Sequence, residues 1–187
     1  MNIVNPQSMV PREVFFTRGV GRHRHRLQSF ELALRHAGIA ICNLVMVSSI
    51  FPAKCKIISR KRGIDKLTAG AITYCVMARS DTNEPSRRCC SGVGLAVPAS
   101  GDHYGYISEH HGYGMNKAQC GDLVEDMAAT MLATTLGVEF DPNKAYDERK
   151  EIYRMSGKIV KTRAEVQVAE GCEDGRWTTV LAAAVFV

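Results

Sequence analysis

Two adjacent serines, Ser48 and Ser49, stand where an apolar, strand-forming run ends. The run begins at Asn43, and Pro52 stops regular structure three residues after the pair. A strained turn here would let the Ser49 hydroxyl attack the Ser48 carbonyl and convert the peptide into an ester. Elimination of that ester would leave dehydroalanine, which hydrolyses to ammonia and a chain that starts with a pyruvoyl ketone. A Ser-Ser pair at a strand end is common, so these two residues alone do not establish self-cleavage.

A second group of reactive side chains follows the segment from His103, which we expect to be a strand that ends at Glu109. Glu109, His110 and His111 together invite a metal interpretation. Because neighbouring residues on a strand point to opposite faces, at most Glu109 and His111 could serve one ion. No other ligand set is evident, and we expect no metal site. An exposed carboxylate at a strand end is the ordinary explanation of Glu109.

Two further polar residues need an explanation. Glu31 precedes Arg35 by four positions on an expected helix, which is the spacing of a surface ion pair. Asn43 is polar within an apolar run, and a buried amide without a hydrogen-bond partner is costly. A cap on a neighbouring loop is its ordinary explanation.

The first half of the chain contains one clear helix signal. Ser29 is suited to be the N-cap of a helix that runs through Ala37, with Gly38 as its left-handed stop. Before it, residues 14–17 predict a short strand closed by a turn at residues 19–21. Further strands are expected in the apolar segments 71–78 and 89–97.

The second half contains the strongest helix pattern. Asn116 and Gln119 form a capping-box pair, and a continuous apolar face follows until Gly137. A shorter helix is expected from Asp141 to Met155. The chain then predicts a hairpin: an alternating strand over 160–168, a turn at 171–175, and a strand over 177–187 that is apolar on both faces and therefore central.

These elements favour the α+β class. Strands outnumber helices and do not alternate strictly with them, so we expect mainly antiparallel or mixed sheets covered by helices. The length of 187 residues and the 45% hydrophobic content suit a single domain over residues 1–187.

Composition indicates which partners and which cellular compartment to expect. The net charge of +5 comes largely from loop-like basic clusters without interleaved aromatic residues, so nucleic-acid binding is not expected. The seven cysteines form an odd set without a C-x-x-C pair, which indicates free thiols in a reducing compartment. The N-terminus lacks a signal pattern and no apolar run approaches a membrane span, so we expect a cytoplasmic protein that does not bind membranes.

Four segments, in this order, resemble the pyruvoyl-dependent arginine decarboxylases: residues 30–34, the serine segment 43–52, residues 105–109 and residues 177–179. The resemblance runs from about Phe15 to Val187 and implies an αββα sandwich. It also implies cleavage between Ser48 and Ser49 into a β chain, residues 1–48, and an α chain, residues 49–187. The covalent cofactor would then be a pyruvoyl group derived from Ser49.

The resemblance assigns further roles. Glu109 matches the general acid that protonates the substrate carbon, and Asn43 matches a residue that positions the Ser48 carbonyl during processing. Glu31 matches the acidic residue that holds the substrate guanidinium, although members of the family carry Asp there and Glu31 is one methylene longer. The implied reaction converts L-arginine to agmatine and CO2 through a Schiff base, in a homotrimer with sites between subunits.

Two alternatives stay open from the sequence. One keeps the pyruvoyl chemistry but takes another basic amino acid, lysine or ornithine, as the substrate. The other is a binding or scaffold protein in which the Ser48-Ser49 bond stays intact.

Overall fold

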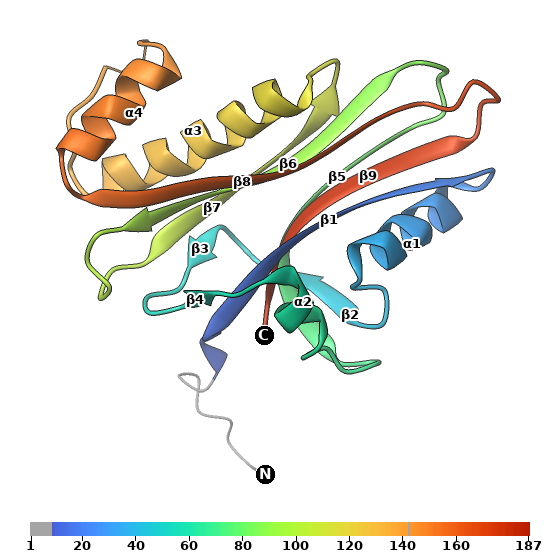
Figure 1. The fold of residues 1–187 in the computed structure, drawn as a ribbon, viewed down its shortest axis with the longest axis horizontal. Coiled ribbons are helices and arrows are strands. Elements are labelled where there is room, and N and C mark those ends of the chain that lie inside the picture. Colours follow the sequence, from blue (N-terminus) through green and yellow to red (C-terminus); the bar gives the residue numbers. More distant parts are fainter. Residues whose placement is uncertain (1–8, 142) are drawn as a thin grey trace.

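Two β-sheets packed face to face form the centre of the molecule, and helices cover their outer faces (Figure 1). The computed structural model describes residues 9–141 and 143–187. The four layers, helix, sheet, sheet and helix, confirm the predicted α+β class. In chain order the elements are β1 (Glu13–His23), α1 (Arg26–Ala37), β2 (Asn43–Met46), β3 (Ile50–Phe51), β4 (Lys56–Ile57), α2 (Arg60–Ile64), β5 (Ile72–Thr82), β6 (Arg88–Pro98), β7 (Gly105–Tyr113), α3 (Lys117–Thr135), α4 (Tyr146–Met155), β8 (Ile159–Glu170) and β9 (Trp177–Phe186).

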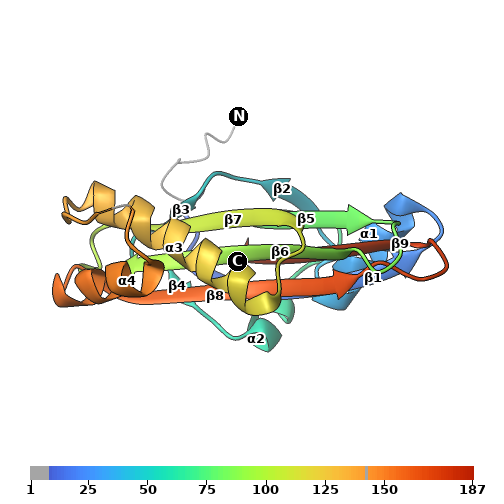
Figure 2. The ribbon, with the colours of Figure 1, turned by 90° about the horizontal axis from the view of Figure 1, so that it is seen from above.

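The two sheets differ in composition. The five-stranded sheet has the order β2-β5-β9-β1-β4, with antiparallel pairs at its centre and parallel pairs to both edge strands. The four-stranded sheet, β3-β7-β6-β8, is antiparallel throughout. The edge strands β2 and β3 lie along the same side of the molecule (Figure 2).

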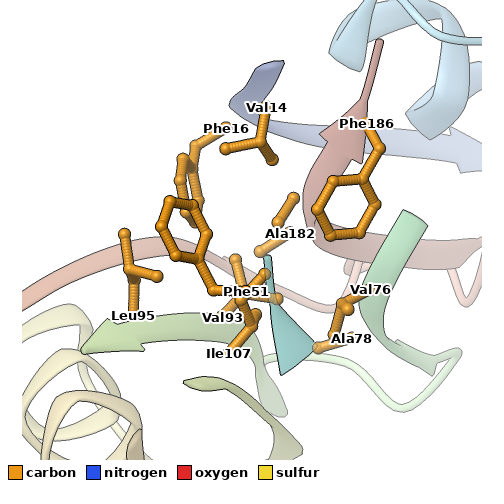
Figure 3. Close-up of a cluster of buried hydrophobic side chains, with 11 residues drawn as sticks. Val14, Phe16, Phe51, Val76, Ala78, Val93, Leu95, Ile107, Ala182 and Phe186 are labelled. Carbon is orange, nitrogen blue, oxygen red and sulfur yellow. The ribbon is translucent and has the colours of Figure 1, made fainter. Parts of the chain in front are cut away.

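The largest apolar cluster fills the space between the sheets (Figure 3). A second cluster lies between α1 and the five-stranded sheet, and a third lies under α3 and α4. Each sheet therefore buries apolar side chains on both faces, which is why β9 is apolar all round. Its central position in the five-stranded sheet confirms the prediction made for it.

The predicted turn at residues 19–21 is wrong, because β1 continues through it to His23. The glycines there allow helix α1 to approach the strand. A Cβ atom on Gly19 would lie 2.0 Å from the carbonyl oxygen of Ala33, and one on Gly21 would lie 2.1 Å from that of Ser29. Glycine at these positions serves close helix-to-sheet packing rather than a change of direction.

The predicted C-terminal hairpin is also wrong. β8 pairs with β6 in the four-stranded sheet, whereas β9 pairs with β1 and β5 in the other sheet. The intervening turn therefore carries the chain from one sheet to the other. The alternating pattern of β8 suits an edge strand, while β9 requires cover on both faces.

The helix signals are correct in part. The capping box of Asn116 and Gln119 begins α3, and Gly38 ends α1 with a φ of +79°. However, α1 begins at Arg26, and Ser29 lies inside it, where its hydroxyl is 2.6 Å from that of Thr179 on the sheet. The predicted start of the shorter helix is wrong, since α4 begins at Tyr146; residue 142 lies outside the described residues.

Candidate processing and active site

The Ser48-Ser49 peptide lies in the segment that crosses from β2 in one sheet to β3 in the other. Just before the pair, the backbone N–H of Val47 donates to the Cys75 carbonyl oxygen on β5 at 3.0 Å. Just after the Ser48-Ser49 bond, the carbonyl oxygen of Ser49 accepts a hydrogen bond from the backbone N–H of Ile107 on β7 at 2.7 Å. The serine pair is therefore attached to one sheet on its upstream side and to the other sheet on its downstream side.

Ser48 forms part of the wall of a mainly apolar groove of about 550 Å³. Ser48 itself is exposed and Ser49 is half-buried. Such an apolar wall disfavours the charged carboxylate of a bound molecule and so favours a reaction that removes this charge. The groove is lined by Met9, Val10, Pro11, Val47, Ser48, Ile50, Pro52, Ala53, Tyr74, Tyr104 and Phe186.

Glu109 lies on the strand that holds Ser49. The predicted strand end at Glu109 is wrong, because β7 continues to Tyr113. Glu109 is two positions beyond Ile107, so the two side chains share the face turned toward the five-stranded sheet. The Glu109 side chain is exposed, and within the described part of the chain it has no ion pair or side-chain hydrogen bond. Burial, with a further contribution from the Glu109 charge, raises the pKa of the Cys75 thiol to about 11.

Asn43 stands at the opposite end of β2 from the serine pair. Its side-chain amide donates to the carbonyl oxygen of Gly70 at 2.8 Å, in the loop that precedes β5. Asn43 is exposed, so burial imposes no cost on its amide. Within one chain, its contact is therefore the loop cap that the sequence suggested as the ordinary explanation.

Glu31 lies on α1, which covers the outer face of the five-stranded sheet (Figure 1). Its carboxylate accepts a hydrogen bond from the Arg35 guanidinium at 2.5 Å, and its side chain is 43% exposed. This is the surface ion pair expected from their spacing. Of Glu31, Asn43 and Glu109, only Glu109 lies on the strand that contacts Ser49.

The sequence did not point to the groups that hold the serine segment. Those groups are the backbone amide of Ile107 and the backbone carbonyl of Cys75, and backbone atoms carry no residue-type signal. The groove residues Tyr74 and Tyr104 were also missed. Tyr104 follows the β6–β7 turn. The pKa of the Tyr104 hydroxyl is raised, mainly by a hydrogen bond with Tyr106.

Among the described residues, no group of three or more His, Cys, Asp and Glu side chains is placed to hold a metal ion. None of the helices in this part of the chain is long and apolar enough to span a membrane.

Comparison with known proteins gives a consistent result. Residues 13–187 match the family model described as pyruvoyl-dependent arginine decarboxylase. The chain is 57% identical to a probable pyruvoyl-dependent arginine decarboxylase of Chloroherpeton thalassium and 59% identical to one of Chlorobium limicola, each over 96% of this chain and 99% of the relative. It is 54% identical to pyruvoyl-dependent arginine decarboxylase 2 of Methanosarcina mazei, over 96% of this chain and 98% of the relative.

Proposed function

The chain belongs to the family of pyruvoyl-dependent arginine decarboxylases, and from this premise we propose that Ser49 is the source of its pyruvoyl group. Cleavage between Ser48 and Ser49 gives a β chain of residues 1–48 and an α chain of residues 49–187. The mature enzyme converts L-arginine to agmatine and CO2. The observation that carries the assignment of Ser49 is the position of the serine pair in a crossing between two sheets, fixed to each of them by a backbone hydrogen bond.

Processing begins when Ser49 Oγ forms a bond to the Ser48 carbonyl carbon and the peptide C–N bond breaks. The Ser49 nitrogen takes up a proton and becomes a free amine, and the two residues are joined by an ester. Loss of the Ser49 α-proton then expels the Ser48 carboxylate from Cβ and leaves dehydroalanine. One water molecule converts its imine tautomer to the ketone and releases ammonia. No external oxidant or reductant is needed.

The surroundings of Ser49 fit the group that forms there. The adjacent groove is mainly apolar and open to an incoming small molecule. The pyruvoyl ketone supplies the electron sink for loss of CO2. The apolar wall disfavours the charged carboxylate of the substrate. Glu109, on the strand that holds Ser49, donates the proton that the substrate carbon requires after decarboxylation.

The two remaining site residues act from a neighbouring subunit. Glu31 binds the guanidinium of arginine, and Asn43 positions a Ser48 carbonyl. Two observations support this assignment. Within one chain, Glu31 lies on the outer helix α1 and Asn43 at the end of β2 away from the serine pair. Apolar side chains are also left exposed on and beside edge strand β2, namely Val45, Met46 and Ile72 at 40%, 54% and 68%. A homotrimer with sites between subunits satisfies both observations.

Intact-mass measurement of the purified chain tests the proposal. We expect two fragments, with a carbonyl-reactive hydrazine probe attached only to the fragment that starts at residue 49. Ser49→Ala removes the attacking hydroxyl and stays full length, whereas Ser48→Ala is the matched control that keeps this hydroxyl and is still cleaved. A wild-type chain that remains intact after long incubation would instead support the scaffold alternative.

The identity of the substrate needs a separate assay. Arginine, lysine and ornithine are offered to the cleaved protein and the released amine is identified. Agmatine from arginine as the main product supports the proposal. Preferential decarboxylation of lysine or ornithine would assign the enzyme to a different basic amino acid.

A further inference from the structure

The strand that follows Ser49 is too short to hold it firmly through its backbone alone. β3 consists of Ile50 and Phe51, which pair with Tyr106 and Gly105 of β7. A two-residue pairing offers few hydrogen bonds, and isolated short pairings are marginal in water. The position of Ser49 therefore depends on what else anchors this segment.

The side chain of Phe51 provides such an anchor. Phe51 is 4% exposed, whereas its neighbour Ile50 is 40% exposed. Phe51 belongs to the apolar cluster between the sheets and reaches into it from β3 (Figure 3). Ile107, whose backbone holds the Ser49 carbonyl, belongs to the same cluster. Burial of one aromatic side chain thus fixes the strand, and Ser49 lies two residues away, about 7 Å along it.

The segment downstream of Phe51 is also fixed. The Cys55 N–H donates to the Pro52 carbonyl oxygen at 3.2 Å and closes a turn. Lys54 occupies the left-handed region in this turn, with a φ of 61°, and its ammonium pairs with Asp102 at 2.9 Å. These contacts lie beyond Phe51 in the chain, so Phe51 is the buried side chain nearest to Ser49 on that side.

We propose that Phe51 is a positioning residue for both stages of the reaction, and this inference rests on the proposed function. Before cleavage, the buried ring keeps the Ser49 hydroxyl aligned with the Ser48 carbonyl carbon. After cleavage, the new α chain starts at residue 49 and loses its covalent link to β2. Phe51 and the Ile107 amide then hold the pyruvoyl-bearing terminus on the four-stranded sheet, and the groove lies beside it.

The test compares three variants in the full-length protein: Phe51→Ala, Phe51→Leu and Phe15→Ala. Phe15 is the matched control, because it is fully buried but lies in the other cluster, under α1. The first-order rate of appearance of the two fragments is followed by mass spectrometry, together with the unfolding midpoint and kcat and KM for arginine. We expect Phe51→Ala to slow cleavage about 10- to 100-fold, and to lower kcat of the cleaved fraction more than it changes KM. Phe51→Leu, which keeps an apolar anchor, restores most of the cleavage rate.

Each outcome is decisive. Cleavage of Phe51→Ala at the rate of Phe15→Ala, with comparable loss of the unfolding midpoint, would overturn the positioning role and leave the proposed function intact. A cleavage rate for Phe51→Leu as low as that of Phe51→Ala would also overturn it. If Phe51→Ala does not fold, Phe51→Val takes its place in the comparison: slower cleavage than in Phe51→Leu supports the role, and cleavage as fast as in Phe51→Leu contradicts it. An intact wild-type chain would reject both the positioning role and the proposed function.

Discussion

The backbone N–H of Ile107 donates a 2.7 Å hydrogen bond to the carbonyl oxygen of Ser49. One strand, β7, therefore holds Ser49, the residue at the proposed cleavage point, and carries Glu109 two positions after Ile107. Because alternate residues of a strand share a face, Glu109 is turned toward the same inter-sheet side as Ile107. The two expected functions of the site, processing and proton donation, thus share one structural support.

Replacement of Glu109 separates these two functions. Glu109→Gln keeps the size of the side chain but removes the carboxyl proton that we propose it donates. Cleavage should proceed as in the wild type, while kcat for arginine falls by about 10²- to 10⁴-fold. Glu170→Gln is a control, since it removes an exposed carboxylate from the same sheet. Fragment analysis and a CO2-release assay measure both steps, and wild-type turnover in Glu109→Gln would reject the assignment.

Replacement of Glu31 tests whether its carboxylate serves the substrate or only Arg35. Glu31→Gln should raise KM for arginine about 10- to 100-fold, because a hydrogen bond between two charged groups is lost. Arg35→Gln breaks the same surface pair but leaves the carboxylate in place, and KM should not rise. Steady-state kinetics of both variants give the KM values for this comparison. Equal, small effects of both substitutions would show that the ion pair is only structural.

Cleavage should not separate the two fragments. The proposed β chain contains β1, which pairs with β9 of the proposed α chain from Val14↔Phe186 to His23↔Trp177. Helix α1, also in the β chain, buries the outer face of that sheet. Native mass spectrometry should therefore find both fragments in one particle, and concentrated guanidinium should release them. Free fragments under native conditions would contradict this arrangement.

Close packing at Gly19 should make this position intolerant of a side chain. The Cβ of Gly19→Ala would meet the Ala33 carbonyl oxygen at 2.0 Å, so α1 must move away from β1. We expect a loss of about 1–3 kcal/mol in the free energy of unfolding. Gly101→Ala is the matched control, because its added Cβ meets no atom within 4 Å. Denaturant titration compares them, and equal stability of the two variants would disprove the tight contact.

Glu13 should stabilise the fold in a pH-dependent way. The Lys66 ammonium, which donates to it, lowers the pKa of the Glu13 carboxyl, and the charge of Arg62 adds to this against the effect of desolvation. A pKa that is lower in the folded state than in the unfolded state stabilises the protein above the ordinary carboxyl range, and this contribution disappears as the pH falls through the folded-state pKa. Glu13→Gln should therefore lower the unfolding midpoint near neutral pH and match the wild type in acid. A pH-independent difference would contradict this linkage.

Several features followed from the sequence alone because their causes are local. The capping box of Asn116 and Gln119, the left-handed stop at Gly38 and the all-round apolar pattern of β9 each depend on residue types a few positions apart. The order of four motif segments between residues 30 and 179 also sufficed to indicate the family that the comparisons establish.

Other features were decided only by the tertiary structure, because they depend on contacts between residues far apart in the chain. The periodicity of β8 and β9 is compatible with a hairpin, and only cover from α1 and from the opposite sheet assigns them to different sheets. The role of Gly19 depends on where α1 packs. The same holds for Ser49: its residue type suggests a nucleophile, but its attachment to Ile107 is a backbone contact between strands of opposite direction, which no side-chain pattern encodes.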